Sequence, residues 1–339
     1  MREYPNLLEL FHQLKTPAEE VGRGQCFSVI SLPGKPNIKL AKNIDDAPCI
    51  LIHTNSEYSQ EYLAPILLEN LMIEFDLECL VYHQDSSVEK NRFSVIICRE
   101  KTPFIINYFF QVMISVFDTI EENPTNLNIH DALMAVVDLF RCLGQPPKKS
   151  TQGLWAELFV IMHSSSPNIL IEAWHTTPED RYDFCAGSFR IEVKSSSQRI
   201  RKHHFSLEQL NPPSNTSLLI ASVFVERVGG GISINELMEK IKTKINGQPM
   251  LIFQLEKIIA QTLGNGLQNG LSERFDYELA ENSLRFYDYR VLPSINPNLP
   301  SGVSEVKFTS DFNEKQSIDL SYYRSLGGIF EIALFAAKS

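Results

Sequence analysis

The sequence predicts a mixed α/β (α+β) protein in which helices flank a central mixed β-sheet. Two patterns indicate this class: short apolar runs bounded by Pro, Gly, Asn and Asp, typical of strands, and longer segments with helical apolar spacing. With 43% hydrophobic and 21% charged residues, the composition is that of a globular protein, not of a collagen-like, coiled-coil or disordered chain. The length of 339 residues corresponds to two or three structural units.

Residues 1–145 are expected to form an N-terminal α+β region of unassigned role. Thr102 is a good N-cap and Pro103 fits the first helical position, so a helix is expected to start there. Gly144 and Pro146 are expected to end the next helix. The expected helices cover residues 5–15, 102–120 and 128–143, and the expected strands cover residues 26–32, 38–42, 48–53, 67–75, 77–83 and 92–98.

A boundary is expected in the segment Gln145–Ser150, so that residues 146–228 form a compact central unit and residues 229–339 a C-terminal α+β region. The central unit should contain a helix, three strands, a short helix and a long apolar strand. The C-terminal region is a candidate for binding DNA or a partner protein. It begins with three glycines at 229–231, which lack the lysine and spacing of a phosphate-binding P-loop and are expected to be a flexible linker. Two helices, 233–246 and 249–263, are expected next, followed by short β-like segments.

The charge and the cysteines restrict the class of protein further. The formal net charge is −10, which disfavours a protein that coats nucleic acid or membranes through bulk charge. The six cysteines form no CxxC pair and no zinc-finger spacing with His, so free thiols in a reducing compartment are expected. The N-terminus has no apolar signal core, and the most apolar stretch is too short to cross a bilayer. These features predict a cytoplasmic protein without a membrane partner.

A buried carboxylate is predicted in the central unit. Within Leu154–Met162, Glu157 is the only residue that is not apolar. A helix that is apolar nearly all round is buried. A lone buried carboxylate costs on the order of several kcal/mol unless it meets a cation, a hydrogen-bond donor or a proton. Glu157 therefore belongs either to a functional site or to a structural pair with an Arg or a backbone group.

A second group of charges lies on a predicted hairpin. The segment Phe189–Lys194 alternates apolar and charged residues, which is the period of a half-buried strand, so Glu192 and Lys194 share a face. A two-residue turn at positions 186–187 would place Asp183 on the same side, diagonally from Glu192. A loop one residue longer would move Asp183 to the apolar face.

If Asp183, Glu192 and Lys194 lie on one face, they can form a site for a metal-dependent reaction. Two close carboxylates repel unless a cation lies between them. Oxygen ligands from Asp183 and Glu192 suit Mg²⁺, with Mn²⁺ as a substitute, and Mg²⁺ retains water molecules for reaction. Lys194 beside such a site can orient a water molecule or balance charge on a phosphoryl transition state. The pattern therefore predicts hydrolysis of a phosphodiester.

The segment that follows is basic, although the whole chain is acidic. Residues 190–202 contain five basic residues and one acid, interleaved with Ser and Gln. Such a segment is a candidate for phosphate contacts, and a solvated charged loop is the alternative. The candidate DNA-binding residues are Arg190, Ser195, Ser196, Arg199, Arg201, Lys202 and His203.

This order of features resembles the PD-(D/E)XK nuclease superfamily, and the chain as a whole resembles the bacterial "PD-(D/E)XK motif protein" family found near restriction-modification and phage-defence genes. Two positions depart from the superfamily signature. Tyr182 stands where a proline is expected, and Ala156 stands where a glycine often precedes the helical Glu, but neither change removes a functional group. The segments that carry the resemblance are Gly153–Leu158, Tyr182–Phe184, Ile191–Ser195 and Ser206–Leu210.

The resemblance implies a restriction-endonuclease-like fold and a Mg²⁺-dependent DNA endonuclease of a restriction or phage-defence system. Lys194 would position the attacking water, and Gln209 would support the site. DNA would be the partner, together with other subunits of such a system, and double-strand cleavage makes a homodimer plausible. The implied metal ligands are Asp183, Glu192, the backbone carbonyl of Val193 and, in an assisting position, Glu157.

An acid-x-Lys triplet alone is weak evidence, because about two are expected by chance in such a chain. The second triplet, Glu305–Lys307, follows Asp288, but prolines interrupt its approach and no buried-Glu helix precedes it, so an exposed strand is expected. Two alternatives to a nuclease remain: a non-cleaving scaffold that binds DNA or a partner protein, and a structural ion network without nucleic-acid function. Metal binding tests the first alternative, and salt-dependent affinity for DNA tests the second.

Overall fold

The computed structural model describes residues 4–17, 25–54, 63–175 and 181–334. The chain divides into two compact units, Met1–Pro146 with Gly264–Gln268 and Pro147–Leu263 with Asn269–Ser339. Helices and sheets occur in both units, so the predicted mixed α+β class is confirmed. Within the described residues, no helix is both long and apolar enough to span a membrane.

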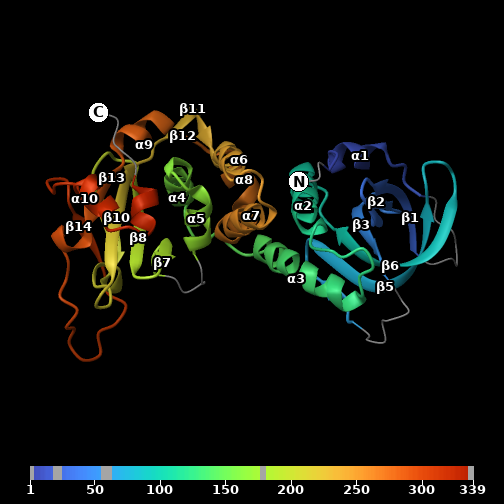
Figure 1. Ribbon diagram of the computed structural model, residues 1–339, viewed down its shortest axis with the longest axis horizontal. Coiled ribbons are helices and arrows are strands. Elements are labelled where there is room, and N and C mark those ends of the chain that lie inside the picture. Colours follow the sequence, from blue (N-terminus) through green and yellow to red (C-terminus); the bar gives the residue numbers. More distant parts are fainter. Residues whose placement is uncertain (1–3, 18–24, 55–62, 176–180, 335–339) are drawn as a thin grey trace. The chain divides into compact units, whose positions relative to one another are not determined.

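The first unit is a sheet that closes on itself, with helices beside it (Figure 1). Its elements are α1 (Leu7–Gln13), β1 (Gln25–Leu32), β2 (Lys35–Asn43), β3 (Pro48–His53), β4 (Ile66–Leu67), β5 (Leu71–Tyr82), β6 (Val88–Cys98), α2 (Pro103–Phe117) and α3 (Asn126–Leu143). The strand order is β1-β2-β3-β6-β5-β4, and β1 also pairs in parallel with β5, which closes the sheet. Buried side chains such as Phe27, Leu51 and Phe93 form the core.

One long strand of this sheet differs from the prediction. The sequence predicts separate strands over residues 67–75 and 77–83, whereas β5 is continuous from Leu71 to Tyr82 and joins the two ranges. A β-bulge shifts the register between Glu74 and Leu77, and Asp76 has a φ of 54°. Arg92 of β6 bonds to both carboxylate oxygens of Asp76 and holds this conformation. Because a bulge bends a strand without ending it, the prediction of two strands is wrong.

The second unit is built on a four-stranded mixed sheet in the order β13-β10-β8-β7. Strands β8 and β10 are parallel, α4 packs on β8, and Phe205, Ile220 and Tyr287 belong to a core cluster beside the sheet. Its first elements are α4 (Thr151–His163), α5 (Pro167–Ala173), β7 (Phe184–Ala186), β8 (Phe189–Ser196), β9 (Lys202–Ser206), the short 3-10 helix η2 (Leu207–Leu210) and β10 (Ser217–Phe224). Helix α5 is absent from the elements predicted for this region.

The C-terminal part of the chain completes this sheet, because β13 pairs with β10 (Figure 1). Residues 269–339 therefore lie in the same compact unit as the predicted central unit. The segment also contains short helices where the sequence predicts only β-like segments. The helices and strands from residue 227 onward are β11 (Arg227–Ser233), α6 (Ile234–Lys244), α7 (Pro249–Leu263), α8 (Leu267–Ser272), β12 (Arg274–Phe275), α9 (Tyr277–Ser283), β13 (Arg285–Asp288), β14 (Lys307–Asp311), α10 (Leu320–Ser325) and α11 (Ile329–Ala333).

The three glycines at 229–231 form part of a strand, so the prediction of a flexible linker is wrong. They lie in β11, which pairs with β12. A Cβ atom on Gly231 would lie 2.1 Å from the carbonyl oxygen of Phe275, whereas a Cβ on Gly230 would meet nothing within 4 Å. The close approach of two backbones explains the glycine at position 231.

This contact predicts a difference between two neighbouring glycines. Gly231→Ala should lower the free energy of unfolding by about 1–3 kcal/mol, because the backbone of Phe275 must move to admit the methyl group. Gly230→Ala is the matched control and should leave stability nearly unchanged. Urea unfolding of both variants tests this, and equal stabilities would contradict the proposed backbone contact.

Candidate active site

The hairpin of β7 and β8 carries the central charged residues, and its turn lies at Gly187-Ser188. The sequence predicts a turn at positions 186–187, which is wrong by one position, since Ala186 pairs with Phe189. Gly187 has a φ of 53°, a left-handed conformation that glycine adopts without strain. The pairing is therefore shifted by two residues, since Phe184 lies opposite Ile191 instead of Phe189. Side-chain parity across the hairpin is unchanged, and the position of Asp183 is level with Glu192 instead of diagonal to it.

Asp183 lies just before β7 and is buried, with 3% of its surface exposed. Its Oδ2 accepts a hydrogen bond from the backbone N–H of Val193 at 2.7 Å, which fixes the carboxylate against β8. Its Oδ1 accepts from Lys149 Nζ at 2.6 Å. The side chain therefore links the start of one strand to the centre of the next.

Glu157 is buried in α4, as its apolar helix predicts. Lys149 Nζ donates to its Oε1 at 2.8 Å, and Trp174 Nε1 donates to its Oε2 at 2.7 Å. His175 Nε2 lies 3.0 Å from the same Oε2. The cation and donors that a buried carboxylate requires are thus present.

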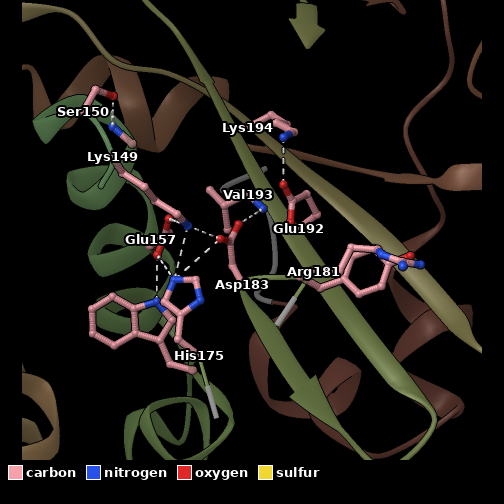
Figure 2. A network of polar contacts seen from close by, with 12 residues as sticks. Lys149, Ser150, Glu157, His175, Arg181, Asp183, Glu192, Val193 and Lys194 are labelled. Atoms are coloured by element: carbon pink, nitrogen blue, oxygen red, sulfur yellow. Dashed lines mark hydrogen bonds and ion pairs between the residues drawn. The ribbon is translucent and has the colours of Figure 1, made fainter. Parts of the chain in front are cut away.

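Lys149 and His175 are site residues that the sequence analysis missed (Figure 2). Lys149 precedes the N-cap residue Ser150 of α4, and His175 follows α5. Ligand atoms of Glu157, His175 and Asp183 all lie within 4.8 Å of one another, a spacing that could hold a metal ion. The only sequence signal for either residue is proximity to a predicted helix or strand, which is too general to single it out.

Glu192 and Lys194 form the second half of the site, on β8. Lys194 Nζ lies 2.7 Å from Glu192 Oε1, and Gln209 Nε2 donates to the same oxygen at 2.7 Å. Lys194 Nζ also lies 4.8 Å from the centre of the Phe205 ring. The other oxygen, Glu192 Oε2, is buried and has no hydrogen-bond partner among the described residues. The structure thus brings together Gln209, Glu192 and Lys194, as the resemblance implies.

Burial and charge act differently on the two carboxylates that share Lys149. Burial, with the negative charges of Glu157 and Glu192, raises the pKa of Asp183 to about 7. Burial also opposes ionisation of Glu157, but Lys149 and His175 lower its pKa to about 2. Burial disfavours the ammonium form of Lys149, yet Asp183 and Glu157 raise its pKa above the ordinary value. At neutral pH the cluster therefore contains an ammonium, an ionised Glu157 and an Asp183 near its midpoint.

These residues line a cleft of about 1120 Å³ in the second unit. One wall is helix α7, which contributes Met250, Phe253 and Lys257. The three carboxylates share the cleft with a larger number of cationic side chains, namely Lys148, Lys149, Arg181, Lys194, Lys202 and Lys257. The cleft is therefore basic in a chain whose net charge is −10.

The predicted DNA-binding residues differ in burial, and two of them lie inside the protein. Arg201 and His203 are buried: Arg201 donates to Ser222 O at 2.9 Å, and His203 Nε2 lies 2.9 Å from Ser222 Oγ. Burial, with Lys194 and Arg201 nearby, lowers the pKa of His203 to about 3, so its imidazole is neutral. Arg201 is thus used within the protein, whereas His203, although buried, also lines the cleft.

The remaining predicted DNA contacts are more accessible. Arg199 and Lys202 are exposed and form ion pairs with Glu226 and Asp311. Arg190 donates to the backbone carbonyl of Gly187 at 2.6 Å. Ser195 and Ser196 are partly exposed at the end of β8, and the Ser195 hydroxyl accepts from Gln152 at 3.0 Å. Of this group, Ser195 and Lys202 line the cleft.

The second acid-x-Lys triplet is not among the described residues that line the cleft. Lys307 begins β14, an exposed strand end that pairs with β9, and Glu305 is exposed before it. Asp288 bonds to Arg290 and Tyr323 instead. The expectation of an exposed strand is confirmed, since most residues of β14 are exposed.

A buried Glu on a helix, an Asp before one strand and a Glu-x-Lys pair on the next define an acid-and-lysine site in a mixed α+β unit. A family described as "Putative PD-(D/E)XK family member, (DUF4420)" matches residues 7–313. The match covers most of the chain, so the protein belongs to this family, and the resemblance seen in the sequence is confirmed. No curated protein and no solved structure matches the chain. The family description points to a nuclease-like protein.

The raised pKa of Asp183 predicts a pH-dependent stability. Because this pKa lies near 7 instead of 3.8, the contribution of Asp183 to stability is present below about pH 4 and is lost as the pH rises through 7. In chelator, Asp183→Asn should therefore gain stability relative to wild type between pH 5 and pH 8, by about 2 kcal/mol.

Urea unfolding at the two pH values measures this gain. Asp311→Asn is the control, since Asp311 is exposed and its pKa is lowered, so it does not titrate in this range. If the free energy of unfolding changed with pH in the same way for wild type and Asp183→Asn, ionisation of Asp183 would not destabilise the folded protein.

Proposed function

We propose that this protein is a Mg²⁺-dependent DNA endonuclease of a bacterial restriction or phage-defence system, with a restriction-endonuclease-like fold in its second unit. One observation carries the proposal. Three buried carboxylates and the Lys194 ammonium meet at a cleft whose other charged side chains are basic. Such a cleft attracts the phosphate backbone, while the acids at its base suit a divalent cation.

The donor set fits a metal ion. Carboxylate oxygens of Asp183 and Glu157 already converge on one cation, the Lys149 ammonium. Glu192 Oε2 is a buried oxygen without a hydrogen-bond partner in the described part of the chain, and a cation would satisfy it. We assign metal binding to these three acids, with the Val193 carbonyl and the His175 imidazole as further ligands. Mg²⁺ or Mn²⁺ held there would supply Lewis acidity and neutralise charge on a phosphate.

The protein's own groups prepare the reaction. Glu192 and Gln209 hold Lys194 in one place, and only 18% of the Lys194 side chain is exposed. A fixed ammonium at the cleft can donate a hydrogen bond to the attacking water or to a phosphate oxygen whose negative charge grows during the reaction. The hydrogen bond from the Val193 N–H to Asp183 fixes the orientation of that carboxylate, so the side chain need not reorient during the reaction.

The cleft also indicates which residues contact DNA. We assign phosphate contacts to Lys202 and Ser195 from the predicted set, and to Lys148, Arg181 and Lys257, which the sequence did not single out. Cutting both strands of a duplex at once takes two such sites, so a homodimer or a complex with other defence subunits is part of the proposal.

A non-cleaving DNA-binding or scaffold subunit is the second candidate function. The observation that favours it is Lys149, which neutralises Glu157 and Asp183 without a metal. The two functions differ in metal binding. A nuclease should be stabilised against heat by Mn²⁺ or Mg²⁺, and Asp183→Ala should lose this effect, whereas a scaffold should show no metal-dependent shift in melting temperature.

Lys194 provides the direct test of cleavage. Lys194→Met should reduce the rate of plasmid cleavage in Mg²⁺ or Mn²⁺ by about 100-fold or more, because it removes the fixed ammonium. It should leave the circular-dichroism spectrum and most of the DNA affinity intact.

Lys307→Met is the matched control, since it removes the lysine of the other acid-x-Lys triplet. It should cut at the wild-type rate. Cleavage by Lys194→Met as fast as that of wild type would refute the assigned mechanism, and DNA binding without metal binding in wild type would favour the scaffold.

A further inference from the structure

The ammonium of Lys149 lies where the potential metal ligands converge (Figure 2). Its Nζ is 2.6 Å from Asp183 Oδ1, 2.8 Å from Glu157 Oε1 and 3.2 Å from His175 Nε2. The same three side chains form the group whose ligand atoms lie within 4.8 Å of one another. One nitrogen thus contacts all three members of this group, while Glu192, the third acid assigned to the metal, is held by Lys194 and Gln209.

His175 shows that an ammonium does not satisfy this group fully. Its Nε2 lies 3.0 Å from Glu157 Oε2 and 3.2 Å from Lys149 Nζ. With a proton on Nε2, the ring donates to Glu157 but opposes the hydrogens of Lys149; without one, it accepts from Lys149 but opposes the carboxylate. A divalent cation would accept lone pairs from both His175 and Glu157 and remove this conflict.

The backbone around Lys149 is anchored, while its side chain is accessible. The N–H of Lys148 donates to the carbonyl of Thr262 at 2.8 Å, and the Ser150 hydroxyl caps α4 by accepting from Gly153 N at 3.2 Å. The Lys149 side chain is 39% exposed and borders the cleft. A change of side-chain rotamer is therefore enough to take the ammonium out of the carboxylate group, without moving the helix.

We propose that Lys149 is an internal counter-cation that occupies the metal site at low metal concentration and is displaced when a divalent cation binds. The inference rests on the proposed metal-dependent function and deepens it. Because the metal must replace an ammonium that interacts with two of its ligands, Lys149 lowers the metal affinity and sets the metal concentration at which the site fills.

This behaviour has two opposite consequences for a variant without the ammonium. The metal-free protein becomes less stable, because two buried carboxylates lose their cation. The affinity for the metal rises, because nothing has to be expelled. A lysine with a purely structural function would produce the loss of stability but not the gain in affinity.

The first experiment compares Lys149→Met with Lys148→Met in the full chain. Both variants retain an aliphatic side chain and remove one positive charge from the same cleft. Isothermal titration with Mn²⁺ and with Mg²⁺ should show binding to Lys149→Met that is about tenfold or more tighter than to wild type. Lys148→Met should change the affinity by about twofold at most, because an exposed charge is screened. In chelator, only Lys149→Met should lower the melting temperature clearly.

The second experiment uses the wild-type protein and so does not depend on the folding of a variant. Amine-reactive acetylation, followed by mass spectrometry, measures the reactivity of Lys149 and Lys148 with and without Mn²⁺. Lys149 should become more reactive when Mn²⁺ saturates the site, because its ammonium leaves the carboxylates. The reactivity of Lys148 should stay constant.

The outcomes separate this inference from the proposed function. Equal metal affinities for Lys149→Met and Lys148→Met, or a Lys149 reactivity that metal does not raise, overturn the exchange of cations and leave a metal-dependent nuclease standing. If wild type and both variants bind neither metal, the metal site itself is refuted, and the proposed function with it.

Discussion

The site depends on one electrostatic constraint: several carboxylates are buried close together in a medium that screens charge poorly. Each feature around them relieves part of that repulsion. Lys149 neutralises two of the acids, and Lys194 with Gln209 holds the third. The acids are Glu157, Asp183 and Glu192. A helix, a hairpin and a short helical turn meet here because each supplies a partner that these charges require.

Local patterns in the sequence account for much of this arrangement. A helix that is apolar all round predicts the burial of Glu157, and period-two alternation places Glu192 and Lys194 on one face. The predicted turn is one position early, because Gly187 fits either place of a two-residue turn. The error leaves Asp183 on the predicted face, since the pairing shifts by two residues, an even number.

Other features depend on tertiary contacts that local patterns do not report. Lys149 lies in a polar segment, and only the fold shows that its long side chain reaches two buried acids.

The wrong prediction that Arg201 and His203 are exposed to DNA has a different cause. Their charge suggests DNA contact, whereas alternation along β9 buries His203 and Phe205 and exposes Lys202. The alternation of residue types along this segment indicates that His203 is buried, but the many positive charges nearby favoured the prediction of DNA contact. The strand that contains residues 229–231 pairs with β12, which is more than forty positions away, through residues on either side of the three glycines.

The pairing of β7 with β8 has a consequence for which changes the hairpin can tolerate. A slip of one strand past the other by one residue would reverse the side-chain faces of β7 relative to β8 and direct Asp183 away from Val193. A residue inserted at Gly187-Ser188 need not cause such a slip, because hairpin loops of two, three and four residues all join paired strands. The position of Asp183 therefore depends on the pairing of Phe184 with Ile191 and not on the length of the loop.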